Sequence, residues 1–394
     1  MNNFSLYTPT KIVFGANSHL QIGDLLKDVS QIVLIHYGSP RIVHSGLLLA
    51  VTDALTKAGI KYLTLGGVVP NPRIDLVYQG IKICVEAKVD HILAIGGGSV
   101  LDSAKAIALG AKITDDVWDY YYIQRHTPRA CLKVSAILTI PAAGSENSSS
   151  SVITNPATKQ KIGYQNDAIR PYISIINPEF FYTLPKADFS AGVFDMMSHI
   201  FERYFSNTTN NDVIDGISEA VLRSIMRNAL IVNKDYTNYA AWSEIALGST
   251  LAHNGLLGAG RVTDWASHQI EHELSAMFDI AHGLGLSIIT PAWMKYVYPT
   301  NKKIFINFAT KIMGLKAHKN ESEDQLILRA ILKLENFSKK LGLKTRLREV
   351  NIPPSSFGQL AKAATTEFGL KTRTLGGLKI LNEEDILKIL NLAY

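Results

Sequence analysis

The stretch HILAIGGGSVLDSAKAIALGA, residues 91–111, joins a short apolar run to three glycines and a strongly helical segment. A short apolar run that ends in turn residues is typical of a buried strand. Glycines let the backbone turn sharply and approach a ligand more closely than residues with side chains allow. The stretch therefore predicts a strand, a ligand-binding turn and a helix, which together form a building unit of α/β folds.

Three further apolar runs, at residues 31–38, 61–68 and 134–141, predict more buried strands in the first half of the chain. Residues 41–59 and 73–89 lie between them and carry apolar side chains at the i, i+3, i+4 spacing of amphipathic helices. Strands that alternate with helices in this way predict a mostly parallel sheet with helices on both faces.

The character of the sequence changes near residue 190. Residues 148–165 still predict two strands, in an antiparallel hairpin around the turn NPAT, whereas nearly every later segment has a helical pattern. We therefore predict two domains. An α/β dinucleotide-binding domain covers residues 1–187, and an all-helical, metal-binding catalytic domain covers residues 188–394.

With 47% hydrophobic and 19% charged residues, the composition is that of a globular enzyme. The net charge of +6 is spread along the chain, so a nucleic-acid-binding surface is not predicted. Cys84 and Cys131 are the only cysteines and neither belongs to a C-x-x-C pair, which argues against thiolate metal sites and disulfides. The start MNNFSLYTPT lacks the pattern of a secretory signal, and no apolar run is long enough for a membrane span. We expect a soluble cytoplasmic protein.

The glycine turn is the first candidate site. Gly96, Gly97 and Gly98 precede Ser99, which occupies the position expected for the helix N-cap. Free N–H groups at the start of a helix favour an anionic ligand, and the carboxyl edge of a parallel sheet is the usual ligand site in such folds. The pyrophosphate of a dinucleotide is the natural guest, although the turn is not the standard G-x-G-x-x-G fingerprint.

Two more loops follow predicted strands and are expected at the same edge of the sheet. Residues 139–149 are rich in small and hydroxyl-bearing side chains, and residues 36–46 occupy the position that commonly meets the adenosine ribose. Gly38, Ser39 and Arg41 stand in that second loop, and it has no Asp or Glu to hold a ribose 2′-hydroxyl. These residues suit a 2′-phosphate, so the sequence favours NADP over NAD.

The helical half contains a cluster of candidate metal ligands. Asp195 and His199 are four residues apart among apolar neighbours, so one largely buried helix face carries both. A buried carboxylate must be paired, hydrogen-bonded or bound to a metal. His268, His272 and His282 form a second group close together in the sequence. Such a set suits a divalent first-row metal, but spacing alone does not choose among the three histidines.

The same segment permits a different interpretation. His268, Glu271 and His272 form H-x-x-E-H, the pattern of one group of metallopeptidases. A peptidase would use Glu271 to activate a water molecule and would need a further acidic ligand downstream. This interpretation leaves the glycine turn and the Asp195–His199 pair without a role, so we do not favour it.

Taken together, the motifs resemble those of the iron-containing (group III) alcohol dehydrogenases, most closely the NADPH-dependent butanol dehydrogenase branch. The resemblance covers essentially the whole chain and rests on residues 67–73, 96–105, 116–121, 139–146, 176–185, 191–205, 264–283 and 291–297. It implies a Rossmann-like cofactor domain and a helical metal domain, similar to dehydroquinate synthase, with the active site between them. Glycerol dehydrogenases and dehydroquinate synthases share the glycine turn, but the segment DWASHQIEHEL fits them poorly.

The resemblance also implies roles for individual residues. Asp195, His199, His268 and His282 match the metal ligands of the family, and His272 matches a residue near the metal that is a candidate proton relay. Asp102, just inside the helix, is assigned both to catalysis and to the cofactor site. The other residues assigned to the cofactor site by the resemblance are Asn71, Gly96, Gly97, Gly98, Ser99, Thr139, Pro141, Gly144 and Ser145.

The implied reaction is reversible hydride transfer between a primary alcohol or an aldehyde and the nicotinamide of NADP(H), with Fe²⁺ or Zn²⁺ as the Lewis acid. Its partner is then a small-molecule alcohol or aldehyde, and family resemblance implies a homodimer. Two departures concern the cofactor. The chain has YGSPR at residues 37–41, where the branch has several glycines and a serine, and Pro40 lacks a backbone N–H. Ala143 stands where a threonine is common.

Overall fold

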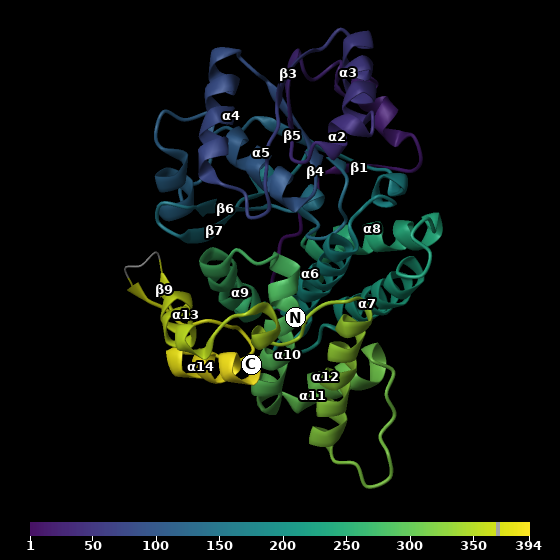
Figure 1. Cartoon of the computed structure of the whole chain (residues 1–394), viewed down its shortest axis with the longest axis vertical. Coiled ribbons are helices and arrows are strands. Elements are labelled where there is room, and N and C mark those ends of the chain that lie inside the picture. Colours follow the sequence, from purple (N-terminus) through teal and green to yellow (C-terminus); the bar gives the residue numbers. More distant parts are fainter. Residues whose placement is uncertain (368–370) are drawn as a thin grey trace. The chain divides into compact units, whose positions relative to one another are not determined.

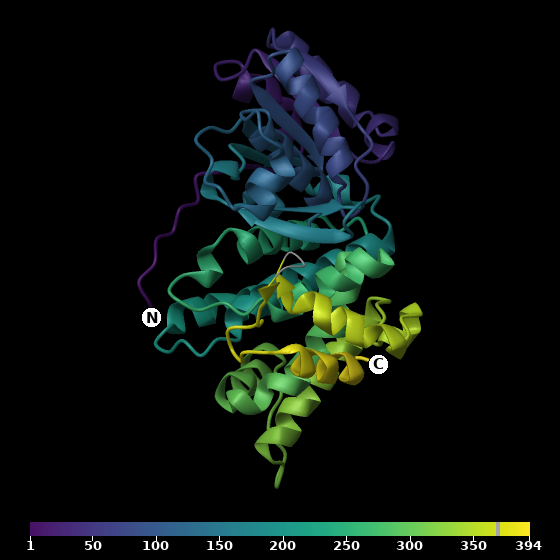
Figure 2. The same ribbon diagram turned by 90° about the vertical axis from the view of Figure 1, so that its left-hand side faces the viewer.

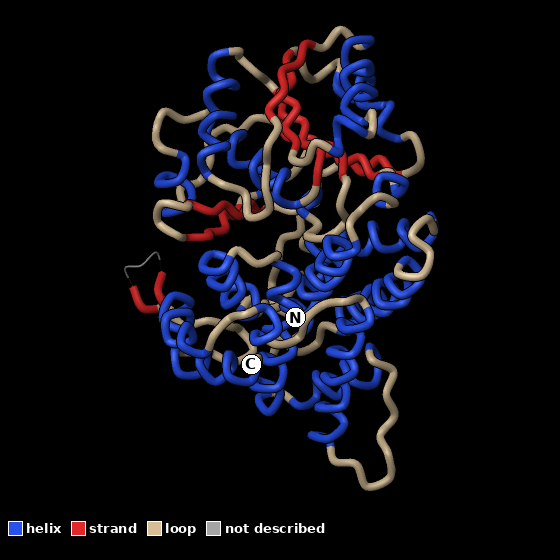
Figure 3. Tube along the Cα trace, in the orientation of Figure 1, coloured by secondary structure: helices blue, strands red, loops and turns tan. Residues whose placement is uncertain are grey.

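The computed structural model describes residues 1–367 and 371–394 (Figure 1). Contacts divide these residues into two units, Tyr7–Leu184 and Pro185–Tyr394 with Met1–Leu6. Strands concentrate in the first unit and helices in the second (Figure 3). The predicted order, an α/β half followed by a helical half, is confirmed.

The first six residues pack against the second unit, although the sequence analysis assigned them to the α/β domain. The Met1 ammonium donates to the carbonyl oxygen of Thr209 at 2.7 Å. The N–H of Asn2 donates to the carbonyl oxygen of Gly260 at 2.8 Å. Because these bonds involve backbone groups alone, the side-chain pattern of the segment gives no signal for them.

The first unit is built, within its described residues, on a six-stranded parallel sheet with the strand order β1-β8-β5-β4-β2-β3. Its strands are β1 (Lys11–Phe14), β2 (Ile32–Tyr37), β3 (Lys61–Leu65), β4 (His91–Gly96), β5 (Lys133–Leu138) and β8 (Ile173–Ile176). The four predicted strands correspond to β2 through β5. β1 and β8 were not predicted, because four residues are too few to establish a period.

Helices cover both faces of this sheet (Figures 1 and 2). α1 (Ile22–Leu26) and α3 (Leu47–Lys57) pack on one face through a core that includes Val33, Ile35, Leu93 and Ile95. α4 (Ile74–Glu86) and α5 (Gly98–Gly110) pack together on the other face. All six residues of β4 are buried, as expected for a central strand that is covered on both sides.

The predicted hairpin is also confirmed. β6 (Ser150–Asn155) and β7 (Gln160–Gln165) pair in antiparallel register, and β6 packs against α5. The hairpin therefore reaches the helix that starts at the glycine turn.

The second unit consists mainly of helices. They are α6 (Lys186–Tyr204), α7 (Asp212–Val232), α8 (Tyr239–His253), α9 (Ala266–Phe278), α10 (His282–Val297), α11 (Lys302–Asn307), α12 (Glu323–Lys340), α13 (Phe357–Ala364) and α14 (Glu383–Leu392). α6 is buried along most of its length and packs against α7, α8 and α10. One short antiparallel pair, β9 (Thr366–Glu367) with β10 (Lys371–Thr372), departs from the all-helical prediction. In the described part of the chain, none of the helices has the length and apolar character needed to cross a bilayer.

Candidate metal centre and nucleotide site

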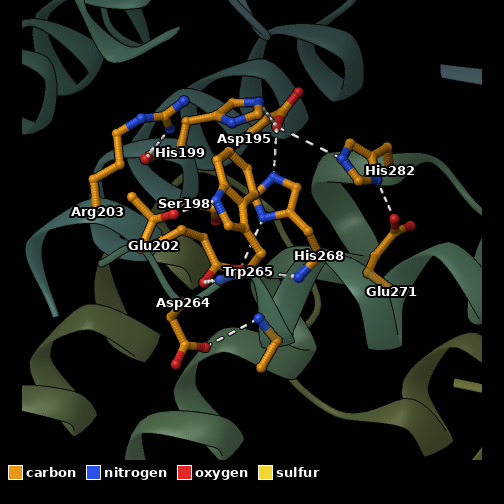
Figure 4. A network of polar contacts seen from close by, with 12 residues as sticks. Asp195, Ser198, His199, Glu202, Arg203, Asp264, Trp265, His268, Glu271 and His282 are labelled. Carbon is orange, nitrogen blue, oxygen red and sulfur yellow. Dashed lines mark hydrogen bonds and ion pairs between the residues drawn. The ribbon is translucent and has the colours of Figure 1, made fainter. Parts of the chain in front are cut away.

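The Asp195 carboxylate lies at the centre of a cluster of imidazoles in the second unit (Figure 4). α6 carries it one turn from His199, α9 supplies His268, and His282 is the first residue of α10. The Nε2 atoms lie 3.3 Å (His199), 3.8 Å (His282) and 3.9 Å (His268) from the Asp195 Oδ1 atom. The fold therefore brings together the four predicted metal ligands from three helices.

Two buried atoms in this cluster have no hydrogen-bond partner within the described residues, namely Asp195 Oδ1 and His268 Nε2. Buried polar atoms almost always have a partner, so a cation is the natural companion of these two lone pairs. Ligand atoms bound at 2.0–2.2 Å around a tetrahedral Zn²⁺ are separated by about 3.4 Å, and the three Nε2 atoms lie 3.3–3.9 Å from Asp195 Oδ1. Asp195, His268 and His282 also lie close enough to one another to share an ion, whereas His199 is outside that group. One carboxylate and three imidazoles also suit Fe²⁺. The residues present thus fit a divalent metal ion.

Two carboxylates accept hydrogen bonds from the Nδ1 atoms of two of these imidazoles. The Nδ1 atom of His268 is 3.0 Å from Glu202 Oε1, and Nδ1 of His282 is hydrogen-bonded to Glu271 Oε2. A carboxylate accepts only, so in both rings Nδ1 carries a proton, and Nε2, on the side of Asp195, is the atom that can bind a metal once it is deprotonated. This arrangement of carboxylate, histidine and metal is common around protein metal sites.

Burial and the charges of neighbouring groups strongly shift the pKa values in this cluster. Burial lowers the pKa of His199 to about 3. Burial acts in the same direction on His268, but the neighbouring carboxylates of Asp195 and Glu202 outweigh it and raise the pKa to about 9. Burial opposes ionisation of Asp195, yet the neighbouring histidines hold the pKa of its carboxyl well below the usual value. The ionised carboxylate therefore demands a positive charge beside it, which a proton or a metal ion supplies.

His272 lies one turn beyond His268 on α9 and belongs to a different grouping. Its ring centroid is 5.5 Å from that of His282, and its ligand atoms approach those of His282 and Glu271 rather than Asp195. Asp195, His268 and His282 form the first grouping. The structure thus separates the two histidines of the H-x-x-E-H pattern. The assignment of His272 as proton relay stays a prediction.

Other residues of this site were not predicted from the sequence. Glu202 accepts hydrogen bonds from the backbone N–H groups of Trp265 (2.7 Å) and His268 (3.0 Å), so it also shapes the start of α9. Trp265 adopts a φ of 67° and lies 4.6 Å from the Arg203 guanidinium, which donates to the carbonyl oxygen of His199. Charged residues inside the buried helix α6 were the available hint, because such residues need partners.

In the first unit, the glycine turn lies where the strand order changes direction. The chain passes from β2 to β3 on one side and then to β4 on the other, so the carboxyl ends of β2 and β4 flank the switch point. A Cβ atom at Gly96 would overlap Val100, and one at Gly38 would lie 2.8 Å from the carbonyl oxygen of Val68. Only glycine fits at these two positions, which leaves a surface lined by backbone at the start of α5.

Ser99 is not the N-cap that the sequence analysis predicted. α5 begins at Gly98, its N-cap is Gly97, and no side chain caps it. Gly97 has an extended backbone (φ −99°, ψ −163°), and glycine at the two positions before Ser99 lets the helix start earlier. Ser99 therefore lies in the first turn, where the N–H groups of a helix lack intrahelical partners. These groups fit a phosphate.

Asp102 and Lys105, one turn apart on α5, hold the second predicted loop. Asp102 Oδ1 accepts from the Ser145 hydroxyl at 2.7 Å, and Oδ2 accepts from the N–H of Val152 at 3.0 Å. The Lys105 ammonium, fully buried, donates to the carbonyl oxygens of Ser145 (2.7 Å) and Ser150 (2.9 Å). Both carboxylate oxygens of Asp102 are thus engaged, which supports a role in loop geometry. Its assignment to catalysis stays a prediction.

Lys105 was missed by the sequence analysis, and a substitution can test its role. Burial lowers the pKa of its ammonium to about 8. Lys105→Met should reduce the free energy of unfolding by about 3–5 kcal/mol, because several loop oxygens lose their buried cation. It should also raise the KM for the nucleotide. Denaturant unfolding and nucleotide KM are the measurements, and exposed Lys112→Met is the control, with a change within about 0.5 kcal/mol. An unchanged midpoint for Lys105→Met would contradict this role.

The remaining residues that were predicted to bind the cofactor also lie in the first unit. The N–H of Thr139 donates to the carbonyl oxygen of Gly96 at 3.0 Å, so the loop after β5 starts beside the glycine turn. Pro141 and Gly144 follow in this loop, both buried, and Gly144 has a φ of 67°. Asn71, buried with a φ of 52°, precedes α4.

Ser39 and Arg41 follow β2, but both have intramolecular partners. The Ser39 hydroxyl oxygen accepts from the N–H of Arg41 at 3.2 Å. The Arg41 guanidinium donates to the carbonyl oxygen of Thr183 at 2.9 Å through Nη1. A nucleotide phosphate would have to bind the other guanidinium donors or replace this contact.

Comparison with known proteins assigns both units. Residues 9–178 match the family described as iron-containing alcohol dehydrogenase, and residues 189–394 match the C-terminal domain of the Fe-containing alcohol dehydrogenase family. The chain belongs to the iron-containing alcohol dehydrogenase family. Its activity class is therefore NAD(P)-linked oxidoreduction of alcohols and aldehydes, as the motifs predicted.

Individual members of the family resemble the chain over its full length. It is 38% identical to NADH-dependent butanol dehydrogenase A of Clostridium acetobutylicum, with 100% of both chains covered. It is 32% identical to the NADPH-dependent aldehyde reductase YqhD of Escherichia coli over 92% of each chain. The crystal structure of NADH-dependent butanol dehydrogenase A from Thermotoga maritima has a TM-score of 0.95 and 38% identity, covering 100% of this chain and 99% of that one. The fold class is thereby confirmed, and these relatives include users of both nucleotides.

Proposed function

We propose that the enzyme transfers hydride reversibly between a primary alcohol or an aldehyde and a nicotinamide nucleotide, assisted by Fe²⁺ or Zn²⁺ at the Asp195 cluster. The convergence of the three Nε2 atoms on Asp195 Oδ1 carries this proposal, because the cluster matches the donor set and spacing of a divalent metal site. Relatives named butanol dehydrogenase and aldehyde reductase support short aliphatic alcohols and aldehydes as substrates.

Several side chains of the protein would each have a separate role in this reaction. When bound, the metal ion supplies a Lewis acid that stabilises negative charge on the substrate oxygen. Glu202 and Glu271 keep the Nδ1 protons of His268 and His282 in place, so that both Nε2 lone pairs face inward. His272, half-buried beside this cluster, would pass a proton between the substrate oxygen and solvent.

The nucleotide would bind the first unit at the glycine turn. Its pyrophosphate would accept hydrogen bonds from the N–H groups at the start of α5. We propose NADP(H) as the preferred nucleotide, because Arg41 follows β2 and no acidic residue stands in residues 36–46. The names of the relatives leave both nucleotides open.

Arg41→Ala tests the nucleotide preference. If the guanidinium binds a 2′-phosphate, the KM for NADPH should rise about tenfold or more, because a charge-assisted hydrogen bond contributes about 1.5–3 kcal/mol. The KM for NADH should not change, which makes NADH the internal control. Equal or better kcat/KM with NADH in the unmutated enzyme would remove the case for Arg41.

The general test is oxidation of NADPH and NADH by the purified enzyme with straight-chain aldehydes of two to eight carbons. Activity should disappear after treatment with a chelator and return when Fe²⁺ or Zn²⁺ is added back. The same assay with the two ions separately identifies the metal that supports turnover. Full activity in the rigorously metal-free enzyme would refute the proposed mechanism.

Glu271→Gln distinguishes this mechanism from that of an H-x-x-E-H peptidase. Both oxygens of Glu271 already accept hydrogen bonds, one from the Ser275 hydroxyl and one from His282. Glutamine can still accept from His282, so aldehyde reduction should persist at saturating metal while metal affinity falls about 10–100-fold. Metal titration and NADPH oxidation measure the two effects. A peptidase would instead lose its activity completely.

We also propose that the enzyme is a homodimer, as the family resemblance implies, and that it is cytoplasmic, as its composition suggests. Light scattering of the purified enzyme should give twice the mass of one chain. A monomeric mass across the working concentration range would contradict the dimer.

A further inference from the structure

The third imidazole of the metal cluster has an outer partner of a different kind. His268 and His282 are each backed by a carboxylate, whereas Nδ1 of His199 lies 2.8 Å from Nδ1 of His253. The two rings are perpendicular, with centroids 4.0 Å apart. His253 is the last residue of α8, which packs against α6.

The short distance between the two Nδ1 atoms restricts where the protons can be. One of the atoms must donate and the other must accept, so a single proton lies between them. If His253 donates, His199 carries its own proton on Nε2, which then cannot bind a metal. If His199 donates, its Nε2 lone pair faces the Asp195 carboxylate, 3.3 Å away. Metal binding therefore requires His253 to accept.

We propose that His253 is a positioning residue for the metal site, which accepts the Nδ1 proton of His199 and so fixes this ligand in its metal-binding tautomer. The proposal rests on the metal site of the proposed function and extends it to a residue on a fourth helix. All three ligand imidazoles then follow one rule, with Nδ1–H directed outward to an acceptor and Nε2 directed inward.

A neutral imidazole acceptor affects the metal ion differently from a carboxylate acceptor, because it adds no negative charge. Glu202 and Glu271 add negative charge behind two ligands, and His253 adds none behind the third. A weaker negative field leaves the ion a stronger Lewis acid.

Two substitutions of similar size separate acceptor chemistry from packing. Asparagine places its Oδ1 close to the position of the histidine Nδ1 and can accept from His199, whereas leucine fills the same space without an acceptor. Metal-free His253→Asn and His253→Leu chains are titrated with Zn²⁺ and, for the ligand-field spectrum, with Co²⁺. Urea unfolding of the metal-free chains shows whether both variants keep their fold.

His253→Leu should bind Zn²⁺ about 10–100-fold more weakly than the unmutated chain, and its Co²⁺ spectrum should change. His253→Asn should bind within about threefold of the unmutated chain and retain the spectrum. Equal affinity in all three proteins would overturn the proposal, and so would an equal loss in both variants. If His253→Leu does not fold, His253→Ala takes its place as the variant without an acceptor. An unmutated chain that binds no metal would refute the metal site itself, which is a different outcome.

Discussion

Replacing His268 with alanine is expected to empty the metal site and to lower kcat/KM by about a thousandfold or more. His268 stands between two carboxylates, with Nδ1 on Glu202 and Nε2 directed to Asp195. Alanine removes one of the proposed metal ligands and leaves the buried Glu202 carboxylate without its imidazole partner. A Lewis acid supplies several kcal/mol to such a reaction, and each 1.4 kcal/mol corresponds to about a tenfold change in rate. Metal content by elemental analysis and aldehyde reduction are the two measurements.

His272→Ala is the matched control, because this residue is also a histidine on α9, one turn away. It should retain the metal, since its ligand atoms group with Glu271 and His282 rather than with Asp195. Its kcat should fall about a hundredfold, as is typical when a group that transfers a proton is removed. A metal-free His272→Ala protein, or a His268→Ala protein with its full metal content, would show that the division between the two histidines is wrong.

Much of the fold follows from local pattern. The strand at 91–96 and the helix after it are specified by an apolar run, glycines and a helical segment, all local in sequence. β1 and β8 are different, because four residues carry too little pattern and their pairing depends on partners far along the chain. The first six residues pack on the second unit through backbone hydrogen bonds, which do not depend on the identity of the side chains and so cannot be predicted from it.

Some residues of the candidate site could also be predicted from the sequence, and others could not. Spacing on one helix was enough to pair Asp195 with His199, and family resemblance selected His268 and His282. Their outer partners were not predictable, because Glu202, Glu271 and His253 acquire a role only when α6, α8, α9 and α10 pack together. Lys105 is similar, since its meaning depends on the loop that folds back over α5.

Gly283→Ala tests whether the packing between two helices controls the proposed metal site. Gly283 follows His282 at the start of α10, where that helix packs against α6. A Cβ atom here would overlap the carbonyl oxygen of Ala191, a backbone group that a side-chain rotation cannot move. The substitution should reduce the free energy of unfolding by at least about 2 kcal/mol. Because α6 carries Asp195, it should also draw His282 away from that carboxylate and weaken metal binding.

Gly216→Ala is the control for the chemistry of the substitution itself. Gly216 is exposed in the second turn of α7, and nothing lies within 4 Å of the Cβ atom that alanine would add. This variant should be more stable than the unmutated chain by about 0.5–1 kcal/mol, because glycine is costly inside a helix. Its metal affinity should not change. Urea unfolding of the metal-free proteins and Zn²⁺ titration give both quantities. If Gly283→Ala matched Gly216→Ala in both, the contact between α10 and α6 would not be what holds His282 at Asp195.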